Sequence, residues 1–122
     1  PDASIVCIEA KTGKVMWRKI PEWLEAVEYR GRKRTFNAST LRASLLWADG
    51  AFIALGELGH LLRLELTPES YKEVSRSWLF SARQTWGLPV LSRGLLYVSQ
   101  NERSFLGQKP PRLMCYDLRA QK

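Results

Sequence analysis

A cluster of basic residues in the first third of the chain is the clearest candidate for binding chemistry. Residues 30–34 read Arg-Gly-Arg-Lys-Arg, and two aromatic residues lie shortly before them. Arginine and lysine attract anionic groups, and an exposed aromatic ring can stack on a base or a sugar. A solvated loop that keeps the protein soluble is the alternative, and charge runs usually have that role. The candidate partner-binding residues, for an anion or a nucleic acid, are Trp23, Tyr29, Arg30, Arg32, Lys33 and Arg34.

No residue pattern predicts catalysis. His60 is the single histidine, and without an Asp or Ser partner in a recognised arrangement a structural or surface role is favoured. Asp49 and Glu57 could form a pair of catalytic carboxylates, but both lie in predicted turns, where acidic side chains are usually solvated. Cys7 and Cys115 have no second ligand at metal-binding spacing, which argues against a zinc site. We therefore predict no catalytic residue and no metal ligand, expect no cofactor in this fragment, and assign no cofactor-binding residue.

Composition places the chain among globular proteins. Hydrophobic residues make up 45% and charged residues 25% of its 122 residues, with a net charge of +7. No apolar run is long enough for a transmembrane helix. Because the chain begins at Pro1 and is strand-like from Ser4, we expect a piece of a longer or processed parent.

Short apolar runs separated by glycine-containing turns predict an all-β fold. Residues 4–18 read as a hairpin, residues 44–80 as a complete four-stranded unit and residues 86–119 as a partial unit. Residues 19–43 interrupt this pattern and read as an insertion that carries the basic cluster. Within it, residues 21–29 have apolar side chains at helical spacing after a proline, so the insertion admits one short helix.

Three of the strand-like segments can be laid over one another, namely residues 6–10, 62–66 and 114–118. Four-stranded units that recur every 40 to 50 residues or so are typical of β-propeller blades. Several strands are apolar on both faces, as expected when each sheet is covered by a neighbour on either side. The pattern predicts an antiparallel β-propeller fragment of about two to two and a half blades.

The segment from Cys7 to Trp17 resembles the signature of pyrroloquinoline-quinone-type (PQQ-like) repeats, Ala-x-Asp-x-x-Thr-Gly-x-x-x-Trp. Cysteine replaces the Ala and Glu9 replaces the Asp, whereas the Thr, Gly and Trp match. In that family the tryptophan docks on the neighbouring blade. Residues 86–119 are similar to the closing blade of secreted bacterial PQQ-like proteins, some of them polyvinyl-alcohol-dehydrogenase-like. The resemblance implies structural docking roles for Gly13, Trp17 and Trp86.

This resemblance implies a non-enzymatic propeller scaffold, periplasmic or secreted in the parent, that binds a protein or polymer partner through its loops. Part of a PQQ-dependent alcohol oxidoreductase is one alternative, with PQQ and calcium in a longer parent. Anion or nucleic-acid binding through the basic insertion is another. Because closed propellers have four to eight blades, we expect the missing blades of a parent, or self-association into a homo-oligomer, to complete the ring.

Overall fold

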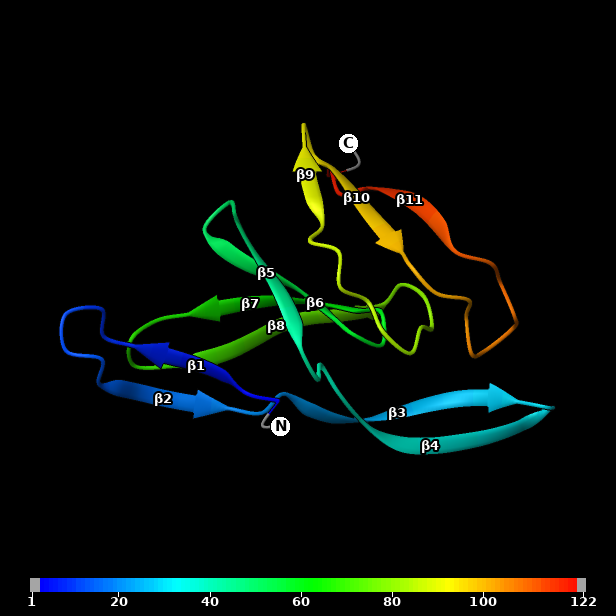
Figure 1. Ribbon diagram of the computed structural model, residues 1–122, viewed down its shortest axis with the longest axis horizontal. Helices are drawn as coiled ribbons and strands as arrows, with labels where there is room; N and C mark the ends of the chain where they lie inside the picture. The colour runs from blue at the N-terminus through cyan, green and yellow to red at the C-terminus, as the bar shows by residue number, and fades with distance from the viewer. Residues whose placement is uncertain (1–2, 121–122) are drawn as a thin grey trace.

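The computed structural model describes residues 3–120, and these residues form only antiparallel β-sheet (Figure 1). The strands are arranged in separate sheets of two, two, four and three strands, none of them closed. This confirms the prediction of an all-β antiparallel fold. The described residues contain no helix that is long and apolar enough to cross a membrane.

The first sheet is the hairpin predicted around Gly13. Strands β1 (Ile5–Ile8) and β2 (Val15–Lys19) pair antiparallel. Gly13 has a φ of 75°, and its N–H donates to the Glu9 carbonyl at 2.8 Å. The positive φ is one that glycine adopts without steric cost. The Thr12 hydroxyl donates to the Glu9 carboxylate and closes the turn further.

The short helix expected within residues 21–29 is wrong, because this segment is a strand. Strands β3 (Glu22–Tyr29) and β4 (Arg32–Ser39) pair along eight residues each. They meet at a two-residue turn in which Arg30 has a φ of 50° and Gly31 a φ of 72°. Two consecutive positive φ values are typical of the two-residue turn whose twist matches that of a β-hairpin. The residues on either side of this turn are therefore extended strands. Burial alternates along β3 with the period of two of a strand.

The largest sheet has four strands in sequence order, β5 (Ala43–Ala48), β6 (Ala51–Gly56), β7 (His60–Leu66) and β8 (Tyr71–Trp78). Asp49 and Gly50, both at positive φ, form the turn between β5 and β6. Gly59 precedes β7 with a φ of +92°, and a Cβ there would lie 2.0 Å from the Phe80 carbonyl oxygen. The chain can pass this point only because residue 59 has no side chain.

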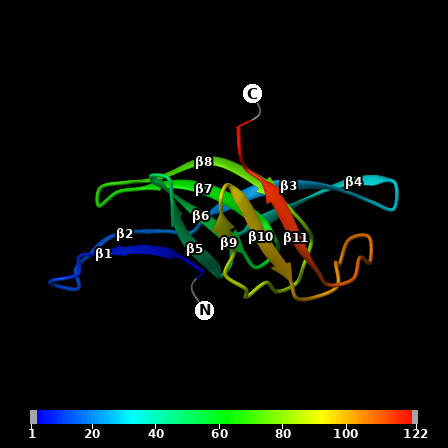
Figure 2. The same cartoon turned by 90° about the horizontal axis from the view of Figure 1, so that it is seen from above.

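The last sheet has the order β11-β10-β9, formed by β9 (Val90–Ser92), β10 (Leu95–Gln100) and β11 (Arg112–Asp117). Arg93 and Gly94 form its first turn, again at positive φ. The 101–111 loop joins β10 to β11. In both views the β1–β2 turn and the β3–β4 tip lie at opposite ends of the molecule, with the 101–111 loop at the tip's end (Figure 2).

The inner strand β6 of the four-stranded sheet is covered on both faces. On one face Leu55 of β6 packs with Leu96 and Val98 of the three-stranded sheet. On the other, its neighbour Ala54 lies in a cluster that reaches Ile5 of β1 and Trp23 of β3. Adjacent residues of a strand point to opposite faces, so a strand buried on both sides must be apolar throughout. This burial explains the continuous apolar run of residues 51–55.

Candidate functional site

The β3–β4 hairpin has two chemically different faces. Its register pairs Trp23 with Ala38, Glu25 with Phe36, Val27 with Arg34 and Tyr29 with Arg32. Residues that pair across an antiparallel ladder lie on the same face, and so do alternate residues of one strand. One face therefore carries, from base to tip, the side chains of Trp23, Glu25, Val27, Tyr29, Arg32, Arg34, Phe36 and Ala38. We call it the inner face.

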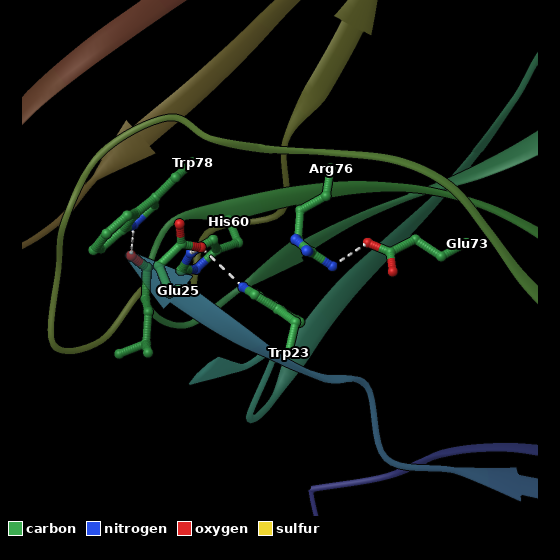
Figure 3. A network of polar contacts seen from close by, with 7 residues as sticks. Trp23, Glu25, His60, Glu73, Arg76 and Trp78 are labelled. Carbon is green, nitrogen blue, oxygen red and sulfur yellow. Dashed lines mark hydrogen bonds and ion pairs between the residues drawn. The ribbon is translucent and has the colours of Figure 1, made fainter. Parts of the chain in front are cut away.

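The base of the inner face is fixed to the four-stranded sheet by a polar contact (Figure 3). The Glu25 carboxylate lies 2.8 Å from Nε2 of His60, which begins β7. The indole N–H of Trp23 donates to the same carboxylate at 2.9 Å. Because the carboxylate can only accept, Nε2 carries the proton in this contact. The pair anchors β3 across the start of β7.

His60 is fully buried between two tryptophans. Its ring stacks on Trp78 with 4.6 Å between centroids and an interplanar angle of 13°, and the edge of Trp23 meets it at 4.9 Å. Burial lowers the pKa of His60 below 6.5, against the opposing effect of the Glu25 hydrogen bond and charge, and Arg76 lowers it slightly further. Nδ1 is buried without a hydrogen-bond partner. A neutral imidazole that holds two sheets together fits these observations.

Arg76 of β8 completes the same cluster. Its guanidinium lies 4.2 Å from the centroid of the Trp23 ring and forms an ion pair with Glu73 at 2.7 Å. Trp23, a sequence-predicted partner-binding residue, is thus half-buried at the base of the hairpin and not at its tip (Figure 3). The Glu25–His60 contact was missed at the sequence level because 35 residues separate the two partners.

The tip of the inner face is basic and open. The Arg30 guanidinium lies 5.2 Å over the ring of Tyr29, which is 44% exposed. Tyr29, Arg30, Arg32 and Arg34 line a solvent-open hollow of about 460 Å³. Among residues 3–120, no carboxylate forms an ion pair with these three arginines. The structure therefore gathers four of the six sequence-predicted residues around one hollow.

Lys33 is separated from these four residues. In the strand register it lies opposite Glu28, and both side chains belong to the other face of the hairpin. Its side chain does not line the basic hollow. Sequence reasoning grouped it with the arginines because residues 30–34 are contiguous, whereas strand geometry sends every second side chain to the other side.

A second hollow, apolar in character, adjoins the basic one. It has a volume of about 370 Å³. The 101–111 loop supplies one wall, and the Leu106 N–H donates to the Ser81 hydroxyl at 3.1 Å, which fixes that loop on the body. Phe105 and Leu106 were not singled out from the sequence, where they lie in an irregular loop. The apolar hollow is lined by Val27, Tyr29, Arg34, Thr35, Phe36, Phe105 and Leu106.

The residues expected to dock one unit on the next have different surroundings. The indole N–H of Trp17 donates to the Thr67 carbonyl at 2.8 Å, and its ring meets Tyr71 edge-on at 6.0 Å. Trp17 thus lies against the β7–β8 end of the neighbouring sheet. Trp86 is 52% exposed, with the Arg42 guanidinium 4.8 Å over its ring. Gly13 shapes its own turn, and a Cβ at this position would meet only open space.

Comparisons with known proteins found no match: no protein-family model, no curated protein and no solved structure matches this chain. Within residues 3–120, no group of three or more His, Cys, Asp or Glu side chains is close enough to hold a metal ion. The candidate site, the inner face of the β3–β4 hairpin, is described by its own geometry.

Proposed function

We propose that the chain is part of a PQQ-like propeller scaffold without catalytic activity, and that it binds an anionic polymer through the inner face of the β3–β4 hairpin. The remaining blades come from a longer parent or from further copies of the chain. In this proposal the parent is a secreted or periplasmic protein.

The sheet arrangement supports the scaffold part of the proposal. The inner strand β6 of a four-stranded antiparallel sheet packs on one face against the three-stranded sheet and on the other against residues of the two-stranded sheets. Stacked four-stranded sheets of this kind are the building units of propellers. The contact of Trp17 with Thr67 of the next sheet corresponds to the docking role that the repeat signature implies.

One observation carries the binding part of the proposal. Arg30, Arg32 and Arg34 surround a single open hollow, and no described carboxylate is paired with them. Cations held close together repel one another, and a polyanion that spans them removes this repulsion while it releases counterions. The hairpin is fixed at its base by the Glu25–His60 contact, which holds the backbone that carries the three arginines. A preorganised cationic surface loses less entropy on binding than a mobile loop does.

The proposal is tested by titrating the full chain into fluorescently labelled heparin and measuring anisotropy. The double variant Arg32→Gln/Arg34→Gln should weaken binding at least tenfold, since each arginine contacts the ligand's anionic groups. The matched control is Lys11→Gln/Lys14→Gln, which removes the same charge from the distant β1–β2 turn. It should change the affinity by less than about threefold, through the long-range field alone.

Two results would contradict the proposal. Equal losses in the two double variants would show that only net charge attracts the polymer. Binding by the unmodified chain that is absent, or that does not weaken as salt is raised from about 50 to about 200 mM, would exclude an electrostatic site.

A further inference from the structure

We infer that the anionic polymer is a single-stranded nucleic acid, with its phosphates in the basic hollow and an unpaired base in the adjoining apolar hollow. This inference rests on the proposed function and specifies its partner. It depends on the relation between the two hollows of the inner face.

The two hollows are contiguous. Tyr29 and Arg34 line both of them. Beyond these shared residues, the basic hollow adds Arg30 and Arg32, whereas the apolar hollow adds mainly hydrocarbon and aromatic groups, among them Phe105. A ligand that lies along this face therefore meets guanidinium groups and apolar surface in direct succession.

Few polymers have the matching chemistry. A single-stranded nucleic acid alternates anionic phosphates with bases whose flat faces are free to stack on aromatic rings. In a duplex each base face is already covered by its neighbours, so no base face is free to stack on a protein ring. A sulfated polysaccharide supplies anions but no flat aromatic group for the apolar hollow. The combination on this face therefore favours unpaired nucleotides.

The cation type and the aromatic arrangement agree with this partner. All three cations at the basic hollow are arginines, whose planar guanidinium can contact phosphate with two parallel hydrogen bonds and can also stack on a base. Arg30 already lies over one side of the half-exposed Tyr29 ring. On the loop side, the Gln100 side chain donates to Ser104 at 3.0 Å, so the wall that carries Phe105 is held before any ligand arrives.

The test compares three labelled ligands by anisotropy at one salt concentration: an oligothymidine of about 12 nucleotides, a duplex of the same length, and a heparin oligosaccharide. The single strand should bind at least fivefold more tightly than the duplex. Tyr29→Ala and Phe105→Ala should each weaken oligothymidine binding by a factor of about 5 or more, because one base loses a stacking partner. Neither substitution should change heparin affinity by more than twofold or so, since no stacking is involved. Lys33→Gln, on the opposite face, is the matched control and should have little effect on the single strand.

The outcomes separate the inference from the proposal on which it rests. Heparin binding that depends on Arg32 and Arg34, together with equal or weaker binding of the single strand, would overturn the inference and leave the proposed function standing. Loss of binding to all three ligands would overturn both. If an acidic poly(Glu-Tyr) peptide displaces oligothymidine at lower concentration than unlabelled oligothymidine does, the partner is an acidic protein segment and the inference fails. Circular dichroism of each variant checks that the chain keeps its β structure.

Discussion

Replacing His60 with alanine should remove the contact that holds the β3–β4 hairpin on the four-stranded sheet. The residue is 0% exposed, and its ring stacks on Trp78 and forms a T-shaped contact with Trp23. Each aromatic pair contributes about 0.5–1.5 kcal/mol beyond its buried area. The hydrogen bond to the Glu25 carboxylate adds about 1.5 kcal/mol, a value at the low end because that side chain keeps partial contact with water. We expect the free energy of unfolding to fall by about 3 kcal/mol, as for other buried aromatic side chains.

Urea denaturation followed by tryptophan fluorescence measures this loss. A double-mutant cycle with Glu25→Gln isolates the charged contact, because glutamine keeps an oxygen acceptor and removes the charge. The coupling energy between the two positions should be about 1 kcal/mol or more. A loss below about 1 kcal/mol for His60→Ala, or no coupling in the cycle, would refute the argument that this pair anchors the hairpin.

The same histidine gives the stability a pH dependence of known sign. Its pKa is lowered from 6.5 in the folded chain, with burial as the largest cause. Below 6.5 the unfolded chain binds a proton that the folded chain binds less readily. Stability should therefore be complete above about pH 7 and decrease as the pH falls through 6.5 toward the lowered value. Since His60 is the only histidine, His60→Phe, which keeps an aromatic ring but cannot titrate, should flatten this dependence. A wild-type chain that becomes more stable between about pH 7 and pH 5.5 would contradict the assignment.

Three further predictions concern the sheets and the cofactor. Gly59→Ala should lower the free energy of unfolding by about 3 kcal/mol or more, because a Cβ would overlap the Phe80 carbonyl at a φ of +92°. Gly13→Ala, with open space around it at a φ of +75°, should cost only about 1–2 kcal/mol; equal losses in denaturant titrations would contradict this. Trp17→Phe removes the hydrogen bond to the Thr67 carbonyl and should lower the free energy of unfolding by about 1 kcal/mol in the same assay. An unchanged denaturation midpoint would mean that the indole N–H adds nothing to stability. Added PQQ with Ca²⁺ should leave the Tm of the chain unchanged, and an increase would favour the oxidoreductase alternative.

The strands that turn at glycine were predictable from the sequence. Gly50 and Gly94 follow residues that adopt positive φ, and apolar runs flank both turns. The continuous apolar run of β6 was also informative, because such a run is typical of a strand covered on both faces. Turn residues and apolar runs can be recognised within a short segment of sequence.

The hairpin was misinterpreted because two periodicities fit its first strand. Apolar residues at 23, 24 and 27 suit a helix, and the alternation of Trp23, Glu25 and Val27 with exposed neighbours suits a strand. The Arg30-Gly31 turn decides in favour of the strand. At the sequence level these residues were interpreted as part of a basic cluster, and their role as a hairpin turn was missed. The partner of His60 could not be foreseen either, since Glu25 reaches it only after β3 packs across the sheet. Contacts between distant segments depend on sheet packing, which no local pattern encodes.

The most direct test of the central claim is amide hydrogen exchange of the full chain with and without bound heparin. If the inner face of the β3–β4 hairpin is the binding surface, exchange should slow in residues 27–36, which include the lining of the basic hollow, and should be unchanged in the β1–β2 turn, which is also basic. Protection centred on the β1–β2 turn, or spread evenly over all basic segments, would contradict the claim.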